Sequence, residues 1–466
     1  MHPFSQILMS TVITILLIPM LSTGAAGQSK MPQQGSPATR PLQPLPEYMK
    51  PFVERFLRSA CKAPTGSGTT HNINVTASQV WTEAGSPHVL PFDINISAPV
   101  TIEACAVVRI AVNKTITILP GGVFIAAGKN RLPVTIEPLV VGKPWMQIRA
   151  LGGVLSLTHA VVVGGGASLP ALVAQSAALR VQNGSLHVDE VEIVDSQSQG
   201  VLLNGTGGFD ASSHDLWVHG SVGFPVNVFA NLVGSIPSGQ YRGNGRDAIG
   251  IGLAGGPVRV TQTMFNHGVP YHVGTGQDGG RMDINSQVSG SVAVLTIQSG
   301  VTILFPPGGM LFVTGLGALI ANGSGGSPIV FTSDQGAPAA GSWIGIRIGN
   351  PINSSTVMHN VKVMFAGGVD SAQSNSCPYP GFPITNDAAI RILGEPPTQF
   401  ITNTEIVATA RHSIDRGWQS NVQPNFLTTN MFPAGPPNPG ASCKQTTPKN
   451  VTGSNCPMSP ASPPCP

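Results

Sequence analysis

Residues 328–347 have the sequence PIVFTSDQGAPAAGSWIGIR, and residues 133–149 have the related sequence PVTIEPLVVGKPWMQIR. In each segment a proline opens a run rich in Val, Ile or Phe, turn-forming residues follow, and a second apolar run begins at a tryptophan. Short β-branched and aromatic runs bounded by Gly, Pro and Asp are typical of β-strands. Neither segment has the sustained 3.6-residue periodicity of an amphipathic helix. We therefore predict short strands joined by turns in both segments.

These segments belong to two longer series of motifs that occur in the same order. The offset between the series is 195 residues from Pro133 to Pro328, 198 from Trp145 to Trp343 and 200 from His159 to His359. A fixed order with a nearly constant offset predicts a duplicated segment. The first series comprises residues 121–125, 133–136, 145–149 and 159–163, and the second comprises residues 308–312, 328–331, 343–347 and 359–363.

A shorter repeat lies inside the duplicated region. Residues 191–195, 216–220 and 264–268 can be overlaid, with His219 placed 24 residues after Asp195 and 48 residues before His267. A period of about 24 residues that holds short strands indicates a parallel β-helix. One coil cannot bury its own apolar face, so neighbouring coils must stack and share a continuous core.

The run PIVFTS at residues 328–333 is followed by WIGI at residues 343–346 and by HNV at residues 359–361. This succession resembles the bacterial secreted proteins built from right-handed parallel β-helix repeats, which have a pectate-lyase-like architecture. The resemblance extends over about residues 100–430. It implies an all-β, right-handed parallel β-helix solenoid, and it implies no particular activity because this architecture hosts lyases, hydrolases and adhesins.

The two ends of the chain differ from the repeat region. An apolar run from Ile7 to Leu21 is followed by small residues, which predicts a signal peptide cleaved near Ala26; a run this short does not favour the alternative of a membrane anchor. A helical turn is expected around residues 47–59. We predict a signal peptide over residues 1–27, a linker and N-terminal cap over 28–84, the internally duplicated solenoid over 85–430 and a Cys- and Pro-rich tail over 431–466.

The composition limits the possible partners. Charged residues make up 10% of the 466 residues and the net charge is +3, so there is no electrostatic signature of a protein that binds nucleic acid or anionic membranes. Neither Gly-rich cluster, residues 164–166 or residues 255–256, is followed by the lysine and helix of a phosphate-binding loop. We expect no nucleic-acid partner, no membrane span after signal cleavage and no cofactor.

The six cysteines predict disulfides. They form no C-x-x-C pair, so we expect no zinc or other metal site, and an even number in an exported chain favours three disulfides. Cysteines near one end of a rigid solenoid should pair locally. We predict that Cys61 pairs with Cys105, and that the other four pair among themselves: Cys377, Cys443, Cys456 and Cys465.

The candidate catalytic residues are Asp195, His214, Asp215, His219 and His267. Parallel coils stack about 4.8 Å apart, so residues one period apart are expected to be neighbours on one face. An aspartate–histidine pair can act as a base or bind a metal. The alternative, which is more common in solenoids, is a polar ladder at a turn. By the same reasoning the duplicated His159 and His359 are interpreted as turn positions, since they lie too far apart to share a site.

Aromatic residues suggest a binding surface. Trp217, Tyr241 and Tyr271 lie outside the duplicated motifs, and we predict that they line a surface groove where they stack on sugar rings. Trp145 and Trp343 belong to the motifs and are expected in the core. Carboxylates near the C-terminal coils, Asp415 among them, are interpreted as isolated turn residues and surface ion pairs, because no three carboxylates recur at the coil spacing.

Two functional hypotheses follow. The first is an exported, non-catalytic surface or extracellular protein that binds carbohydrate or a cell-surface partner along the flank of the solenoid. The second is a polysaccharide lyase or glycosidase that uses the neighbourhood of Asp195, His214, Asp215 and His219. We favour the first, because stacked coils present a long polar face and because lyases and hydrolases need clustered ionisable groups, which are scarce in this chain.

Overall fold

The computed structural model describes residues 59–167, 176–252, 254–274, 280–369, 388–410, 412–417 and 424–433. Contacts divide the chain into the units Met1–Lys50 and Pro51–Pro466, and every described residue belongs to the second unit. The predicted signal peptide, all but the last residue of the helical turn at 47–59, nearly all of the C-terminal tail, and Cys377, Cys443, Cys456 and Cys465 lie outside the described residues.

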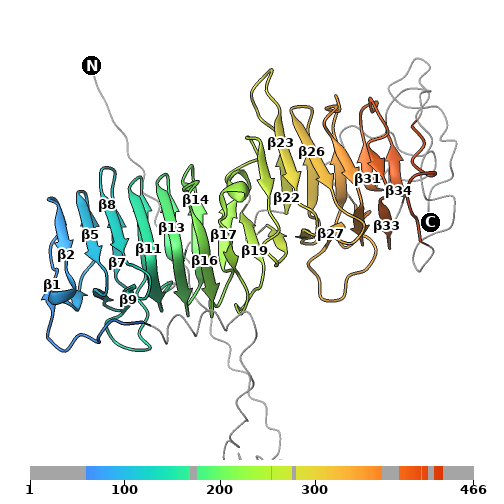
Figure 1. Ribbon diagram of the computed structural model, residues 1–466. Helices are drawn as coiled ribbons and strands as arrows, with labels where there is room; N and C mark the ends of the chain where they lie inside the picture. The colour runs from blue at the N-terminus through green and yellow to red at the C-terminus, as the bar shows by residue number, and fades with distance from the viewer. Residues whose placement is uncertain are drawn as a thin grey trace, which may run out of the picture. The chain divides into compact units, whose positions relative to one another are not determined.

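The strands form four sheets in which each strand pairs in parallel with the equivalent strand of the next coil (Figure 1). The first sheet has the path β1-β3-β6-β9-β11-β13-β16-β18, with four further strands attached. Its strands are β1 (Thr69–Thr70), β2 (Gln79–Trp81), β3 (His88–Leu90), β5 (Pro99–Glu103), β6 (Val107–Ile110), β8 (Val123–Ala127), β9 (Val134–Pro138), β11 (Val154–Val163), β13 (Ser185–Val194), β15 (Gly208–Phe209), β16 (His214–His219) and β18 (Gly239–Gln240).

The second sheet connects coils from both halves of the described region, because its path runs without interruption from β4 to β33. Its strands are β4 (Ile94–Ile96), β7 (Thr115–Ile118), β10 (Gln147–Leu151), β12 (Ala177–Gln182), β14 (Gln199–Asn204), β17 (Val226–Phe229), β19 (Ile249–Gly252), β21 (Tyr271–Val273), β24 (Thr302–Phe305), β27 (Ile329–Ser333), β30 (Val361–Met364) and β33 (Glu405–Val407).

The third and fourth sheets begin where the first sheet ends. The third contains β20 (Gln262–Met264), β23 (Ala293–Ile297), β26 (Gly317–Asn322), β29 (Val357–His359) and β32 (Ile401–Thr402). The fourth contains β22 (Arg281–Ile284), β25 (Met310–Val313), β28 (Gly345–Ile348), β31 (Ala388–Ile392) and β34 (His412–Arg416). Two short 3-10 helices are also described, η2 (Glu83–Gly85) and η4 (Ala230–Ser235).

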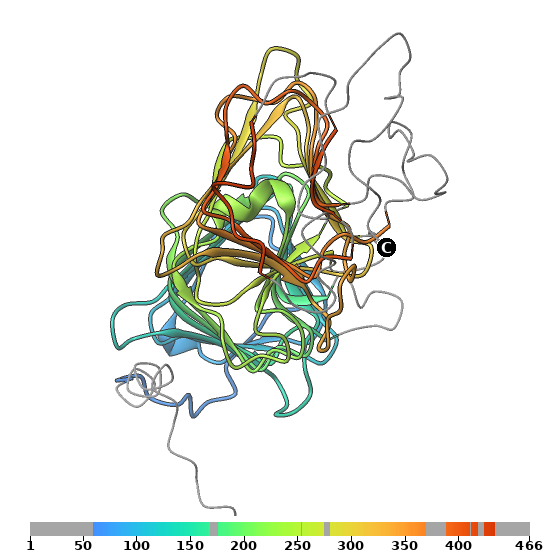
Figure 2. The same cartoon turned by 90° about the vertical axis from the view of Figure 1, so that its right-hand side faces the viewer.

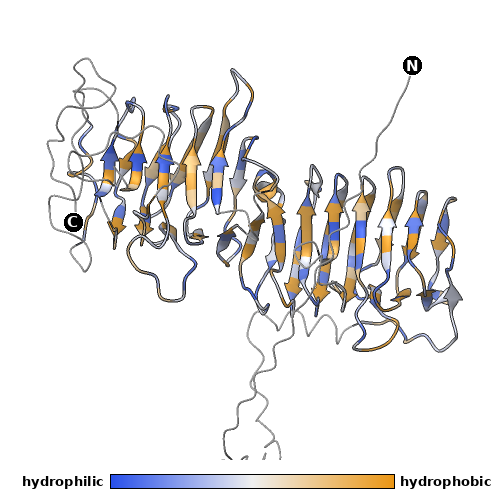
Figure 3. Cartoon of the chain, turned by 180° about the vertical axis from the view of Figure 1, so that it is seen from behind, coloured by the Kyte–Doolittle hydropathy of each residue, from blue (hydrophilic) through white to orange (hydrophobic). Residues whose placement is uncertain are grey.

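This arrangement confirms the prediction of an all-β parallel solenoid. Seen end-on, the strands surround a common interior (Figure 2), and apolar residues recur along the strands (Figure 3). Side chains alternate between that interior and the outer face: Ile148 and Ala150 on β10 are fully buried in the core, and Arg149 between them points outward. Strand pairing begins at Thr69, earlier than the predicted boundary at residue 85.

The tryptophans of the duplicated motifs are core residues, as predicted. Trp145 and Trp343 have no exposed surface. The indole N–H of Trp145 donates to the carbonyl of Val163 at 2.9 Å, and that of Trp343 donates to the carbonyl of Met364 at 2.7 Å. Trp343 also stacks on Phe305, with ring centroids 4.5 Å apart. The two tryptophans of the repeated motifs therefore have the same packing role.

The register of the short repeat is confirmed for two of its three segments. Val191 pairs with Leu216, Glu192 with Trp217 and Val194 with His219, as the overlay of residues 191–195 on 216–220 predicts. The overlay of residues 264–268 is wrong, because β20 pairs with β23 and belongs to the third sheet. The period also varies: residues hydrogen-bonded across neighbouring coils are 25 positions apart at His187 and Ser212 but 43 apart at His359 and Thr402.

The predicted disulfide between Cys61 and Cys105 is confirmed. Their Cα atoms are 5.2 Å apart and they are separated by 44 residues in the sequence. Cys105 lies between β5 and β6, so the bond attaches the first described residues to an early coil of the solenoid.

Candidate functional site

Titratable side chains gather on the outer face of three neighbouring strands, β11, β13 and β16. Each strand is bent at one residue with a left-handed backbone: His159 has φ 44°, Glu190 has φ 54° and Asp215 has φ 52°. The register places these bends side by side, which aligns the neighbouring side chains in columns. We call the resulting set the histidine–carboxylate face; it comprises His159, His187, Asp189, Glu190, Glu192, Asp210, His214, Asp215 and His219.

Histidines on this face lie next to carboxylates of a neighbouring coil. The Nδ1 atom of His159 is 3.0 Å from Glu190 Oε2, and Nε2 of His219 is 3.3 Å from Glu192 Oε1. The remaining two pairs are looser: His214 Nε2 is 3.5 Å from Asp189 Oδ1, and His187 Nδ1 is 3.8 Å from Asp210 Oδ1. The sequence did not identify these carboxylate partners. The overlay of residues 191–195 on 216–220 nevertheless aligned one of them, Glu192, with the candidate residue Trp217.

The candidate residues His214 and Asp215 lie side by side, because Nδ1 of His214 is 3.1 Å from Asp215 Oδ2. His214 thus lies between two carboxylates, Asp215 and Asp189, and its side chain is 53% exposed. Both of its ring nitrogens already face a carboxylate.

Trp217 is half-buried and borders a cavity of about 450 Å³ on this face. Val161, Glu192 and Trp217 form one outward column across β11, β13 and β16. The three glutamates that line the cavity each lie beside a base: Glu190 beside His159, Glu192 beside His219, and Glu137 beside Arg109, whose Nε atom is 2.8 Å from Glu137 Oε1. Each carboxylate on the cavity lining therefore has a basic side chain beside it.

The candidate catalytic residues do not converge in one groove beside Trp217. His219 and Glu192 lie beside it, but His267 lines a different cavity. Asp195 follows the end of β13, and its backbone N–H donates to the carbonyl of His219 at 3.1 Å. The strand register places His219 opposite Val194. The register is thus displaced by one residue from the expected pairing of Asp195 with His219.

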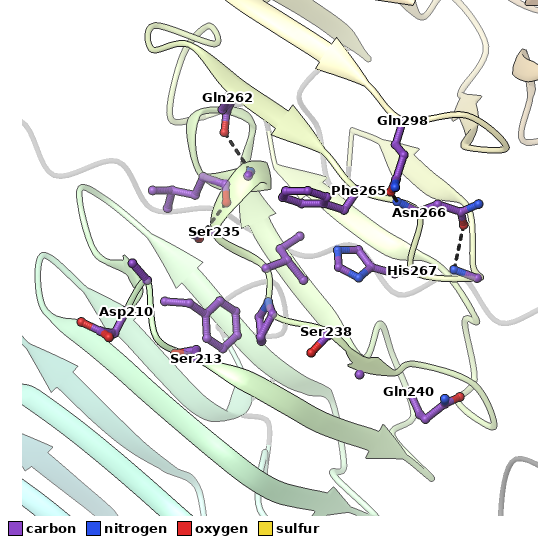
Figure 4. A pocket seen from close by; sticks show the side chains of 18 of the residues that line it. Asp210, Ser213, Ser235, Ser238, Gln240, Gln262, Phe265, Asn266, His267 and Gln298 are labelled. Atoms are coloured by element: carbon purple, nitrogen blue, oxygen red, sulfur yellow. Dashed lines mark hydrogen bonds between the residues drawn. The ribbon is translucent and has the colours of Figure 1, made fainter. Parts of the chain in front are cut away.

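A larger cavity of about 1020 Å³ lies where the first sheet ends and the third begins (Figure 4). We call it the groove. Its walls come from the loop before β16, from η4, from β18 and from the turn after β20. Its lining is rich in amide and hydroxyl side chains, namely those of Ser213, Asn231, Ser235, Ser238, Gln240, Gln262, Asn266 and Gln298.

Several of these amides are held in place by the backbone. Gln262 accepts from the N–H of Gly234 at 2.8 Å and donates to the carbonyl of Ala230 at 3.1 Å, which ties η4 to β20. Gln298 accepts from the N–H of Asn266 at 2.7 Å. The polar lining is thus fixed before any ligand arrives, which lowers the entropic cost of binding.

Apolar and charged groups complete the groove. Phe265 is 42% exposed and its ring borders the cavity beside His267 (Figure 4). Asp210 and Arg242 are the carboxylate and the guanidinium on the lining. Hydrogen bonds from the side chain and backbone N–H of Ser212 lower the pKa of Asp210, so this carboxylate is ionised at neutral pH and is unsuited to act as a general acid.

Tyr241 and Tyr271 are core residues, and the prediction that they line a surface groove is wrong. Both side chains are fully buried. The hydroxyl of Tyr241 donates to the carbonyl of Pro237 at 2.7 Å, and that of Tyr271 donates to the carbonyl of Phe265 at 2.8 Å. Pro237 and Phe265 both line the groove. The tyrosines therefore support its wall from inside.

His267 packs edge-on against Tyr241, with ring centroids 5.4 Å apart. Its Nε2 atom is buried and has no hydrogen-bond partner among the described residues. Burial in these surroundings lowers the pKa of His267 from 6.5 to about 4. The imidazole is therefore neutral at pH 7 and adds another uncharged polar group to the groove.

The lowered pKa of His267 predicts that acid destabilises the folded protein. In the unfolded chain His267 titrates near 6.5, so between pH 6.5 and 4 the unfolded state binds the proton more readily and stability falls as the pH falls. The loss from His267 alone reaches about 3 kcal/mol by pH 4. Between pH 7 and pH 4, the free energy of unfolding of the His267→Phe variant should fall by about 3 kcal/mol less than that of the wild type. Urea denaturation at both pH values measures this. His71, whose pKa burial also lowers to about 4, contributes equally to both proteins. Identical pH profiles would contradict this prediction.

The described residues contain no group of three or more His, Cys, Asp or Glu side chains arranged to hold a metal ion. They also contain no helix of the length and apolarity needed to cross a membrane. Comparison with protein-family models, curated proteins and solved structures finds no significant match to this chain.

Proposed function

We propose that this protein is an exported, non-catalytic protein that binds an uncharged segment of a polysaccharide in the groove. The observation that carries this proposal is the lining of the groove, in which fixed amides and hydroxyls surround an exposed phenylalanine. Sugar rings present hydroxyl groups around their edge and C–H groups on their faces. Amide side chains that donate and accept match the hydroxyls, and the ring of Phe265 offers an apolar face for the C–H groups.

The charge of the groove supports an uncharged ligand. Asp210 and Arg242 are single charges of opposite sign, and His267 is neutral at pH 7 because its pKa is about 4. A uronate polymer would bring one carboxylate per residue into a groove with one guanidinium. Export is supported by the disulfide between Cys61 and Cys105, since such bonds persist in oxidising compartments.

The distribution of carboxylates supports binding over catalysis. A glycosidase places two carboxyl groups across the scissile bond, one of them protonated. Asp210 is the carboxylate on the groove lining, and its lowered pKa disfavours protonation. On the histidine–carboxylate face the glutamates beside Trp217 are paired with bases.

Phe265→Ala tests the groove. We expect the variant to bind neutral oligosaccharides about tenfold more weakly than the wild type, a loss of about 1.4 kcal/mol, because a stacking face is removed. Isothermal titration calorimetry with a panel of neutral oligosaccharides measures this. Phe92→Ala is the matched control, because Phe92 is 58% exposed and lies outside the groove. Equal affinity of wild type and Phe265→Ala for every bound sugar would contradict the assignment.

Incubation of the full chain with neutral and acidic polysaccharides separates binding from catalysis. The proposal predicts binding with no appearance of reducing or unsaturated ends. Release of such ends that is lost in Asp215→Ala or His219→Ala would identify a glycosidase or a lyase on the histidine–carboxylate face and overturn the proposal.

A further inference from the structure

Two arginines lie side by side on the outer face of the second sheet, away from the residues of the groove. Arg149 on β10 pairs in register with Arg180 on β12. Their neighbours along each strand, such as Ile148 and Leu179, are fully buried in the core, so both arginines point outward. Arg180 is nevertheless only 8% exposed. A buried guanidinium normally has a carboxylate partner.

No carboxylate pairs with either arginine in the described part of the chain. Arg180 Nη2 donates to Gln182 Oε1 at 3.3 Å and is 3.1 Å from the amide of Asn204, whose oxygen accepts when oriented toward it. The Nε atoms of Arg149 and Arg180 are buried and have no hydrogen-bond partner among the residues that the structure describes. Residues 168–175, which connect the two coils, contain no Asp or Glu in their sequence.

A similar arginine pair in the fourth sheet has a counter-charge. Arg149 and Arg347 occupy equivalent positions of the sequence motif, four residues after Trp145 and Trp343, although β10 belongs to the second sheet and β28 to the fourth. Arg347 pairs in register with Arg391 of the next coil. Asp415 follows in the coil after that, fully buried, with Oδ2 3.6 Å from the Nε of Arg391. This pair was expected at the surface, and its burial corrects that interpretation.

In the second sheet the residue that pairs in register with Arg180 is Leu202, whereas in the fourth sheet Asp415 pairs with Arg391. Arg149 and Arg180 are thus stacked without an aspartate like the one that lies beside Arg391. Their electrostatic situation is unfavourable: burial and, secondly, the charge of Arg149 lower the pKa of Arg180. An external anion would supply the negative charge that the Leu202 side chain lacks.

We propose that Arg149 and Arg180 bind a divalent tetrahedral oxyanion, either free sulfate or phosphate or the sulfate ester of a glycan. Two adjacent guanidinium groups carry a charge of +2, and guanidinium N–H groups match the oxygens of such an anion in geometry. The site is separate from the groove, and the sulfate test below involves no neutral sugar, so either proposal can fail without the other.

Calorimetric titration of the full chain with sodium sulfate, at constant ionic strength in chloride buffer, tests the site. We expect one sulfate per chain, at least tenfold weaker binding to Arg180→Gln and to Arg149→Gln, and unchanged binding to Arg281→Gln. Arg281 is the matched control because it forms its own ion pair with Asp283 at 2.7 Å. A sulfated monosaccharide that binds more tightly than sulfate would identify the ester as the ligand, and equal affinity would identify the free ion.

Leu202→Asp provides an independent test, because it places a carboxylate in register with Arg180, as Asp415 is with Arg391. We expect this variant to lose sulfate binding and to have a thermal midpoint in sulfate-free buffer no lower than that of the wild type, although a buried leucine is removed. Absence of sulfate binding by the wild type, or full binding by folded Arg180→Gln or Leu202→Asp, would overturn the proposal.

Discussion

Replacement of Trp343 by alanine is expected to lower the free energy of unfolding by about 3–5 kcal/mol, the range found when large buried aromatics are truncated. Trp343 has no exposed surface, stacks on Phe305 and donates its indole N–H to the carbonyl of Met364. Truncation removes the packing and leaves that carbonyl without its donor. Trp145→Ala is expected to have a similar effect, because Trp145 has the same burial and the same kind of hydrogen bond.

The measurement is the shift in urea or thermal midpoint of each variant, followed by tryptophan fluorescence and circular dichroism. Trp217→Ala is the matched control, since it removes the same side chain from a half-buried position on the outer face of β16. We expect the control to shift the midpoint much less. A shift in Trp217→Ala as large as that in Trp343→Ala would show that core packing is not the source of the effect.

Removal of the disulfide between Cys61 and Cys105 is expected to cost about 4 kcal/mol. The bond closes a loop in the unfolded chain between residues 44 positions apart, and the loop-closure entropy for this length is about that size. The double variant Cys61→Ser/Cys105→Ser avoids reducing agents, which would act on the remaining cysteines as well.

The location of this effect can be predicted too. Because the coils of a solenoid contact mainly their neighbours, hydrogen exchange in the double variant should accelerate in β1, β3 and β6 and remain unchanged in β31 and β34. Hydrogen exchange followed by mass spectrometry resolves these segments. Uniform acceleration along the chain would contradict the assumption that the coils unfold separately.

Local features of the fold can be predicted from the sequence because they depend on local patterns. Apolar runs between turn formers indicate parallel coils, and the overlay of residues 191–195 on 216–220 aligns Glu192 with Trp217, which the strand register confirms. The repeated tryptophans indicate core positions, since a duplicated aromatic inside a duplicated strand motif is most simply a packing residue. The pairing of Cys61 with Cys105 is predictable because both lie near one end of the solenoid.

The candidate sites depend on the tertiary structure. Tyr241 and Tyr271 resemble exposed aromatics in the sequence, yet both support the groove wall from the core. The groove itself exists because the first sheet ends at β18 and the third begins at β20. The sequence of a single repeat does not indicate this change of sheet.

The same holds for the charged pairs. The sequence determined which residues point outward from each coil, because side-chain direction alternates along a strand. Which outward residues meet depends on the number of residues between neighbouring coils. That number differs along the chain, from 19 between Thr69 and His88 to 44 between Arg347 and Arg391. Only the assembled solenoid therefore decided that Arg391 meets Asp415 and that Arg180 meets Leu202.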